Sequence, residues 1–326
     1  MRSVALRLGQ GACVLVGISM LVFAVFFATP GADPTARIAG RGASPQILAR
    51  IRHDYGFDRA LPVQYIRMMD KLFVARDLTS FVDHGERVVP EVFAAAPVTL
   101  SLVGGAAIIW VGLSVLIGVV CALWPNGIVD RVLMGLSVLL LSIPVFWLGE
   151  VVNLVTQSRY HDTMLFSWVP PLGYVPFLQS PSGWFRSLLL PWLVLSSSFA
   201  GLYARVLRAE LMAASGEDYM RTARAKGLSP LRIMLNHGLR MSWLGFVSLF
   251  GLDVAQLIGG GALLTEVVFA LPGVGHLTYR ALTDLDLPLI MATVLYSAAF
   301  VVIANALVDL VYLALDPRLR TGTRHG

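Results

Sequence analysis

The longest polar run between apolar segments in the second half of the chain is EDYMRTARAKGLSPLRIMLNHGLR, residues 217–240. Its cations and carboxylates could make polar contacts with a partner, but they do not form a nucleotide-binding loop. Such a loop needs Gly-Lys-Ser/Thr to hold phosphates, and the only lysines, Lys71 and Lys226, follow Asp70 and Ala225. If this protein uses ATP, the ATPase is therefore another polypeptide.

Groups that could bind a metal or act as a nucleophile are equally sparse. Cys13 and Cys121 both fall inside apolar runs, so they predict no disulfide framework. The chain has no H-E-x-x-H motif and no Cys/His spacing typical of a metal site. We therefore expect no catalytic residue, no metal and no cofactor in this chain.

Local signals in the polar run predict two short helices joined by a sharp turn. Asp218 to Lys226 is rich in helix formers, and Gly227 stands where a left-handed residue ends a helix. Ser229 and Pro230 are typical of the cap and the first position of a second helix. Such order is typical of a segment that docks onto another protein. The alternative is a positively charged membrane loop with incidental alanines.

The composition places these helices on a membrane protein. The 326 residues have a mean hydropathy of +0.73 and are only 14% charged, whereas soluble domains carry about 25% charged residues. The net charge of +5 favours cytoplasmic loops rich in Lys and Arg over nucleic-acid binding, because basic and aromatic residues are not interleaved. We therefore expect contact with membrane lipid and none with nucleic acid.

The apolar segments predict an all-α integral membrane protein with six transmembrane helices, since about 20 apolar residues cross a bilayer. Residues 1–29 form the N-terminus and the first helix, residues 30–96 an extracytoplasmic segment, and residues 97–326 a five-helix core with a cytoplasmic tail. Within that core, residues 205–240 form a cytoplasmic loop between the fourth and fifth helices. The predicted spans are 8–29, 97–124, 132–156, 187–204, 241–264 and 287–308.

Finer local predictions concern the outer segment and the connections. We expect helices over residues 44–54 and 62–73, and a loop over 265–288 with a turn at Pro272–Gly273. Pro144 should kink the third span.

The distribution of Lys and Arg sets the orientation. By count, thirteen of them lie in the short connectors and termini on one side of the six spans, and three lie in the two short loops on the other. The long outer segment is left out, because long loops cross the membrane largely regardless of charge. Both termini and the 205–240 loop are therefore predicted to be cytoplasmic.

Several stretches resemble the permease subunits of ABC importers of the peptide and nickel subclass. RTARAKG at residues 221–227 resembles the loop that these permeases dock onto their ATPases, although the glutamate and first alanine of the general pattern are replaced. The resemblance covers nearly the whole chain and is strongest over residues 190–320. Further matching stretches are DRALPVQY (58–65), SIPVFWLG (142–149), EVVFALPGVG (266–275) and VDLVYLALDPR (308–318).

The resemblance implies the first permease of a heterodimer in a bacterial inner membrane. Its partners would be a second homologous permease, two ATPase subunits that bind ATP and Mg²⁺, and an extracytoplasmic substrate-binding protein. Gly227 would form the turn, the small Ala223 and Ala225 would allow close approach, and the cations would make polar contacts. The implied ATPase-coupling residues are Asp218, Tyr219, Arg221, Thr222, Ala223, Arg224, Ala225, Lys226 and Gly227.

A possible translocation path is indicated by Asp253, near the middle of the fifth predicted span. A carboxylate there costs about 2.5–3.5 kcal/mol on insertion scales, so it should face the helix bundle or a watery path. It could contact a peptide amino group, or it could pair with a donor on another helix. The run Gly259, Gly260 and Gly261 could allow close helix contact or break the helix beside the path.

Other functions make different predictions. A stand-alone transporter or channel predicts paired intramembrane charges and internal repeats, and neither is evident. A membrane-embedded enzyme predicts a catalytic set inside the spans, but all six histidines lie outside them. Within the resemblance, dipeptide, longer peptide, glutathione and nickel all stay open as substrates. The outer segment could help to receive a binding protein or form a structural lid.

Overall fold

The computed structural model describes residues 2–28, 34–39, 42–83 and 85–315. These residues form helices and no β-strand beyond one isolated bridge between Thr79 and Arg87. This confirms the predicted all-helical class. The residues 29–33 that open the outer segment, and the predicted tail after Leu315, lie outside the described residues.

Two compact units make up the fold. The first consists of Met1–Thr99, Ile258–Leu263 and Pro272–Ile303, and the second of Leu100–Leu257, Leu264–Leu271 and the remaining C-terminal residues. Helices of the first unit are α1 (Arg2–Ala28), α2 (Pro34–Ala39), α3 (Pro45–Asp54), α4 (Leu61–Met69), the π-helical η1 (Asp70–Val74), the start of α5 (Val88–Leu123), α13 (Val274–Asp284) and most of α14 (Leu287–Leu315).

The second unit contains the rest of α5 and the elements that follow it. These are α6 (Ile128–Ser142), α7 (Val145–Asn153), η2 (Leu154–Arg159), α8 (Pro181–Ala214), α9 (Asp218–Ala225), α10 (Pro230–Ile233), η3 (Met234–Gly238), α11 (Leu239–Gln256) and most of α12 (Leu263–Val268). A last π-helical segment, η4 (Leu257–Gly261), connects α11 to α12.

Four described helices are long and apolar enough to cross a membrane: α1, α5, α8 and α14. A fifth span results if α6 and α7 count as one, although they bend by 94° at the break before Val145. The kink predicted at Pro144 is thus present, and it is sharp enough to divide the third predicted span into two helices. α11 and η4 supply only a shorter apolar stretch, Gly245–Gly261. The prediction of six spans therefore stays a prediction.

Two helices extend beyond the spans that the sequence predicts. α5 begins at Val88 and carries Pro97 in its interior, although the sequence indicates a start at Pro97. Proline removes only one backbone donor, and a helix tolerates this loss where its neighbours compensate for it. α8 runs from Pro181 to Ala214, well beyond the predicted 187–204, because polar ends extend a membrane helix into water at no cost to its backbone hydrogen bonds.

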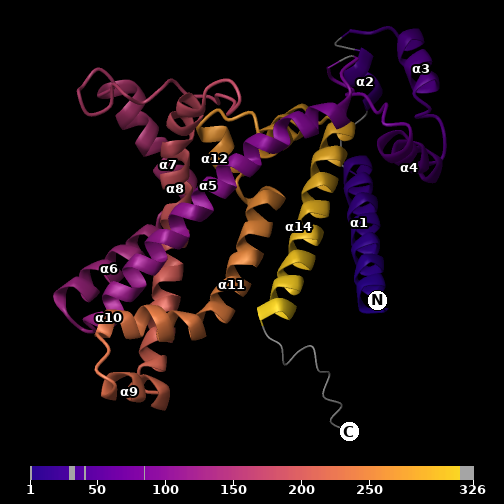
Figure 1. The fold of residues 1–326 in the computed structure, drawn as a ribbon. Coiled ribbons are helices and arrows are strands. Elements are labelled where there is room, and N and C mark those ends of the chain that lie inside the picture. Colours follow the sequence, from indigo (N-terminus) through magenta and orange to yellow (C-terminus); the bar gives the residue numbers. More distant parts are fainter. Residues whose placement is uncertain (1, 29–33, 40–41, 84, 316–326) are drawn as a thin grey trace. The chain divides into compact units, whose positions relative to one another are not determined.

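The outer segment follows its local signals closely. Ser44 caps α3 by accepting a hydrogen bond from the Ile47 amide at 3.4 Å, and Pro45 takes the first helical position. Gly56, at φ +73°, ends this turn in the left-handed region. The second predicted helix is present as α4 and its π-helical continuation η1. Figure 1 shows these short helices beside the end of α1 within the first unit.

The predicted loop 265–288 is largely helical, which corrects the prediction. α12 ends before a turn at Pro272–Gly273, and α13 then begins with Gly273 as its cap. α13 buries Leu277 and Ala281 in the core of the first unit. The apolar positions of this stretch therefore recur at helical spacing, although its glycines and prolines suggest a loop.

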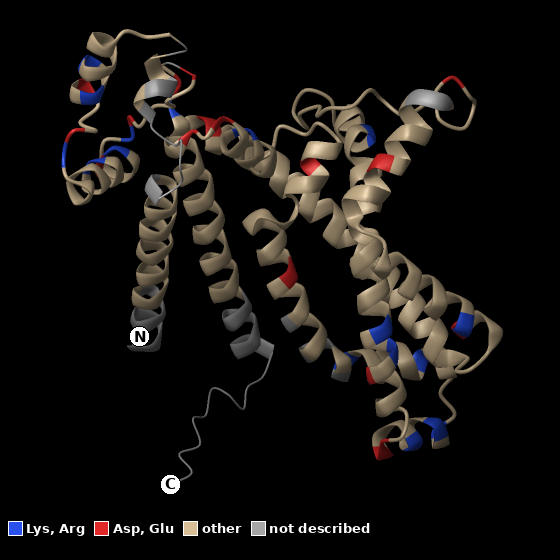
Figure 2. Ribbon diagram, turned by 180° about the vertical axis from the view of Figure 1, so that it is seen from behind, with Lys and Arg blue, Asp and Glu red and all other residues tan. Residues whose placement is uncertain are grey.

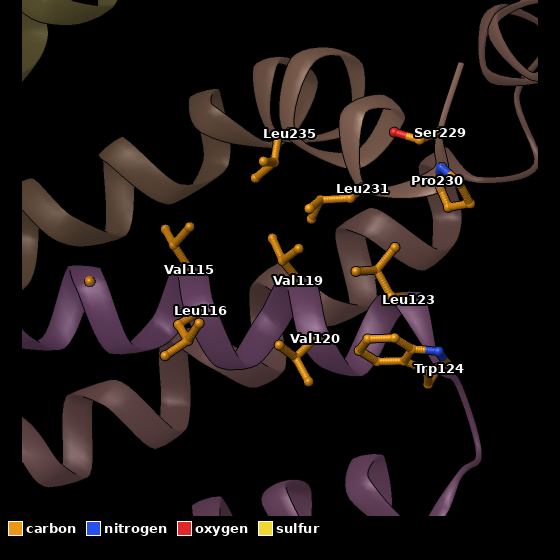
Figure 3. Close-up of a pocket in the computed structure, with 11 residues that line it drawn as sticks. Val115, Leu116, Val119, Val120, Leu123, Trp124, Ser229, Pro230, Leu231 and Leu235 are labelled. Carbon is orange, nitrogen blue, oxygen red and sulfur yellow. The ribbon is translucent and has the colours of Figure 1, made fainter. Parts of the chain in front are cut away.

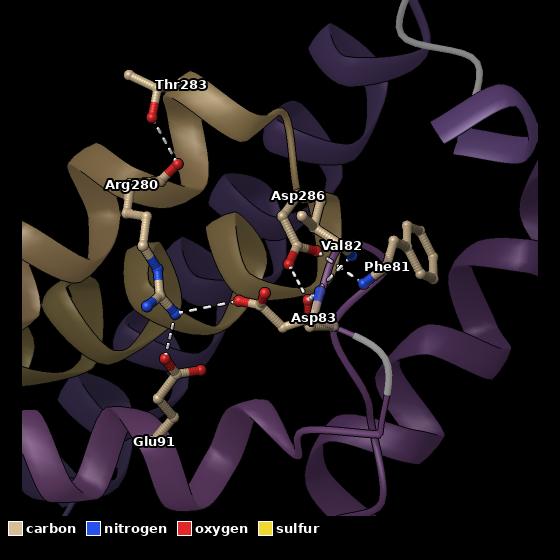
Figure 4. Close-up of polar contacts among 8 residues, drawn as sticks. Phe81, Val82, Asp83, Glu91, Arg280, Thr283 and Asp286 are labelled. Atoms are coloured by element: carbon tan, nitrogen blue, oxygen red, sulfur yellow. Dashed lines mark hydrogen bonds and ion pairs between the residues drawn. The ribbon is translucent and has the colours of Figure 1, made fainter. Parts of the chain in front are cut away.

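A group of polar contacts joins the outer segment to α13 (Figure 4). Asp286, almost fully buried, accepts hydrogen bonds from the Ser80 hydroxyl and from the Phe81 amide, the latter at 3.2 Å. Arg280 contacts Glu91 at 2.5 Å and Asp83 at 3.5 Å. These contacts attach residues 80–91 to the chain about 200 residues later.

We predict that Asp286→Ala loosens this attachment, because it leaves two buried donors without an acceptor. The loss is about 2–4 kcal/mol for two such groups. Trypsin cleavage after Arg87, followed over time on the full-length protein in detergent, should accelerate clearly. Asp77→Ala, an exposed change in the same outer segment, serves as control. Equal cleavage rates in the two variants would contradict the prediction.

Candidate functional site

The polar segment, residues 215–238, contains the helix–turn–helix that the sequence predicts. α9 has one buried face, formed by the fully buried Met220 and by Ala223 at 5% exposure. This face belongs to an apolar cluster with Leu207 and Leu211 of α8 and with Val119 of α5. α9 is therefore held against two long helices of the second unit.

Gly227 makes the turn between α9 and α10. Its φ of +77° lies in the left-handed region, where a residue with a Cβ is strained. Its amide donates to the Arg224 carbonyl at 2.9 Å, and the next amide, of Leu228, donates to the Ala223 carbonyl at 3.4 Å. A Cβ at this position would meet no atom within 4 Å, so the constraint is conformational and not steric.

The opposite face of α9 is exposed and polar. Arg221 lies 3.6 Å from Asp218, an ion pair of two highly exposed side chains that stabilises the helix little. Arg224 reaches the Ser215 carbonyl at 3.4 Å. The remaining predicted coupling residues on this surface, namely Tyr219, Thr222, Ala225, Lys226 and Gly227, are all exposed.

Three sequence predictions about this segment need correction. The loop predicted over 205–240 is shorter, because α8 continues to Ala214 and residues 239–240 already belong to α11. Ser229 stands at the cap of α10 in an extended conformation, but its side chain makes no capping hydrogen bond. Ala223, predicted to allow close approach, packs against the chain's own core and not on the exposed face.

An apolar groove of about 780 Å³ lies between α5 and α10 (Figure 3). Val119 and Leu123 of α5 point toward Leu231 of α10, and Trp124 lies at the end of α5. The groove between the polar segment and α5 is thus lined mainly by apolar side chains, with Ser229 as a polar member.

A buried ion pair fixes the base of α8 beside the polar segment. Arg208 of α8 binds both carboxylate oxygens of Asp130 of α6, at 2.7 Å and 2.6 Å, and the Asp130 side chain is only 4% exposed. Asp130 also accepts the Asn126 amide at 2.8 Å. From the sequence, Arg208 is only one of many predicted cytoplasmic cations, because nothing local marks a partner that lies 78 positions earlier.

Asp253 has a partner on another helix. The hydroxyl of Tyr203, fully buried on α8, donates to an Asp253 carboxylate oxygen at 2.5 Å. The Tyr203 ring packs against Phe246 and lies near Trp110, with centroid distances of 5.0 Å and 6.2 Å. Asp253 itself stays partly exposed, so one side of the carboxyl faces out of this aromatic cluster.

The glycine run, residues 259–261, both breaks a helix and allows close contact with another helix. Gly260 has φ +129° and interrupts the helical backbone of η4. A Cβ on Gly259 would lie 2.5 Å from a methyl group of Val301 on α14, so only glycine fits this contact. Gly259 and Gly260 also line a pocket of about 320 Å³ together with α1 and α14.

Positive charge is concentrated near the polar segment. Figure 2 shows Lys and Arg gathered around α9, whereas the long apolar helices carry few charges. No group of three or more His, Cys, Asp or Glu that could hold a metal occurs among the described residues.

Comparisons with known proteins show the family of this chain. Residues 114–321 match the family model of the binding-protein-dependent transport system inner membrane component, and residues 1–103 match the model of its N-terminal part. The chain is similar to the di/tripeptide transport system permease protein DppB of Pseudomonas aeruginosa, with 32% identity over 97% of this chain and 98% of the relative. It is also similar to the dipeptide transport system permease protein DppB of Escherichia coli, with 30% identity over 96% and 97%. A provisionally named peptide transport system permease protein of Brucella abortus is 35% identical over 96% and 97%.

We predict that Arg208→Ala destabilises the protein by about 3–5 kcal/mol, because Asp130 would remain buried without its partner. Arg205→Ala removes an exposed cation from the same helix and should change stability little. Thermal unfolding of the two purified variants in detergent measures the difference. A similar melting temperature for both would show that the ion pair does not hold α6 to α8.

Proposed function

Because this chain belongs to the family of binding-protein-dependent transport system inner membrane components, we propose that it forms half of the translocation pathway of an ATP-driven peptide importer. The other half is a second, homologous permease. Two separate ATPase subunits supply the energy, and an extracytoplasmic binding protein delivers the substrate. The chain itself catalyses no reaction.

The observation that carries this proposal is the two-sided packing of α9. Its buried face fixes it to α8 and α5, so a force applied to α9 moves two long helices. Its other face presents Tyr219, Arg221 and Lys226 to a partner. A short amphipathic helix that enters a groove of another protein is a common mode of recognition. The ATPase subunit would hold α9 in this way.

The proposed topology has six spans and cytoplasmic termini. α11 with η4 serves as the fifth span, although it is shorter than the others. The count of thirteen cytoplasmic against three external Lys and Arg supports this orientation, although Arg208 is neutralised by Asp130. α9 then lies on the cytoplasmic side, where ATP is available.

Peptides are the proposed substrate class. Three of the relatives are named as permeases of di/tripeptide, D,D-dipeptide or dipeptide transport systems, and they match this chain over almost their full length. Nickel and glutathione stay the alternatives within the wider family. A metal-ion pathway receives no support from the described residues, since Asp253 has Tyr203 as its hydrogen-bond donor and no second carboxylate.

Asp253 and the glycine run are the proposed elements of the pathway. The free side of the Asp253 carboxyl binds the amino group of the passing peptide, while Tyr203 holds the carboxyl in place. Gly260 breaks the helix and leaves backbone carbonyls for the same pathway. In the outer segment, the exposed surface of α3 and α4 helps to receive the binding protein.

The decisive experiment is an affinity purification of the full-length chain in mild detergent, with partners identified by mass spectrometry and assayed for ATP hydrolysis and peptide uptake. Gly227→Val should reduce peptide-stimulated ATP hydrolysis and uptake by about 5–30-fold, because a β-branched residue is strained by about 1–2 kcal/mol in the left-handed region.

Gly227→Asn provides the matched control, because asparagine tolerates the left-handed conformation and should retain most activity. Recovery of the chain without any ATPase or second permease would contradict the proposed function. Full uptake in the valine variant at normal protein levels would instead show that the turn is not needed for coupling.

A second prediction concerns the pathway. Asp253→Asn still accepts the Tyr203 hydrogen bond but loses the charge, so uptake of peptides with a free amino group should fall about tenfold or more. Uptake of N-acetylated peptides should not change. Tyr203→Phe tests the supporting hydroxyl. If both substitutions impair both peptide types equally and lower the melting temperature, Asp253 has only a structural role.

A further inference from the structure

A further pocket, also of about 320 Å³, lies inside the first unit between α1, η1, α5 and α14. Its buried walls include Leu72, Val92 and Leu295, each less than 10% exposed. Two large aromatic residues that line it, Phe73 and Phe93, are 58% and 68% exposed. The interior of the pocket is therefore apolar. Its opening is also bordered by apolar side chains, those of Phe73 and Phe93.

One charged residue lines this pocket, Arg76. Within the described part of the chain, its side chain forms no ion pair or hydrogen bond. Its backbone lies at φ +54°, one residue beyond Ala75, the C-cap of η1. The next amide, of Asp77, donates to the Lys71 carbonyl at 3.1 Å. Glycine or asparagine is preferred at such a position, and another residue is strained. Strained backbone conformations are concentrated at functional sites, so the conformation of Arg76, together with its available guanidinium group, indicates a binding role.

The pocket lies among helices of membrane-spanning length. Three of the helices that line it, α1, α5 and α14, are long and apolar enough to span a bilayer. The lining reaches Ala299, which lies 12 residues into α14 and hence about 18 Å along the helix axis. This depth is close to half of the bilayer's hydrocarbon thickness of about 30 Å. Exposed aromatic residues such as Phe73 and Phe93 suit contact with lipid there.

We propose that this pocket binds a phospholipid, with the phosphate on Arg76 and one acyl chain between α5 and α14. The planar guanidinium group donates two parallel hydrogen bonds to phosphate oxygens, which is the strongest type of contact available to a lipid headgroup. The apolar walls accept the acyl chain without leaving polar groups unsatisfied. The bound lipid thereby fills the gap between η1 of the outer segment and the two long helices.

The test uses the full-length chain, purified in a maltoside detergent with the subunits that accompany it, and titrated with dioleoyl phosphatidylglycerol. Native mass spectrometry counts the bound lipid, and thermal unfolding measures the stabilisation that binding to the folded state produces. The wild-type protein should bind this lipid and gain stability. Dioleoylglycerol, which has the same chains and no phosphate, should bind at least about tenfold more weakly.

Arg76→Gly is the most informative variant. It relieves the backbone strain, so the lipid-free protein should be as stable as the wild type or more stable, and yet its affinity for phosphatidylglycerol should fall at least about tenfold. Lys71→Ala removes an exposed cation of η1 that does not line the pocket, and it should leave binding unchanged. Ala299→Phe fills the pocket and should weaken binding while Arg76 stays in place.

Two outcomes would overturn the proposal. One is undiminished phosphatidylglycerol binding by Arg76→Gly, or equal stabilisation by dioleoylglycerol, since either excludes recognition of the phosphate. The other is protection of the wild type by a peptide, lost in Arg76→Gly, together with no protection by lipid. That result would assign the pocket to a peptide carboxylate.

Discussion

The burial of Met220 and Ala223 is the interaction on which the polar segment, residues 215–238, depends. α9 has only eight residues, and an isolated helix shorter than about 12–15 residues is marginal in water. Full burial of one methionine contributes about 1.5–3 kcal/mol, which is enough to decide whether such a helix forms. The contact also makes α9 part of a body with α8 and α5. The burial of Met220 and Ala223 thus both stabilises α9 as a helix and attaches it to α8 and α5.

Three carboxylates, of which Asp130 and Asp286 are buried and Asp253 is half-buried, hold other parts of the chain together. Asp130 holds α6 to α8 through Arg208, Asp253 joins α11 to α8 through Tyr203, and Asp286 attaches the outer segment through Ser80 and Phe81. Apolar packing within a membrane is weak as a source of specificity, because lipid tails are as apolar as the side chains. A buried charge that needs a particular donor admits only one arrangement. The first two contacts therefore favour α6 and α11 as neighbours of α8, and the third favours one position of residues 80–81.

Local features of the fold could be predicted from the sequence, whereas contacts between distant segments could not. Ser44, Pro45 and Gly227 act through the backbone of their own turn, so their effects follow from residue type and position. Pro97 was misread for the same reason, since local rules favour proline at a helix start.

The partners of Arg208 and Asp253 lie 78 and 50 positions away and come from helices with many polar residues. Nothing in the periodicity of α6 or α8 selects those pairs. The turn at Gly227 could be predicted from the sequence. The burial of Ala223 could not, because it depends on which face of α9 packs against α8 and α5.

The interruption at Gly260 limits what can surround this part of the chain. Irregular backbone at membrane depth cannot face lipid, because lipid offers no partner for a free amide or carbonyl. Gly260 is exposed on the surface of the single chain, while Gly259 beside it packs so closely on Val301 that no side chain fits. One side of the break is thus closed by α14, and the other needs protein or water. The proposed second permease, with the aqueous pathway proposed between the two subunits, would supply both.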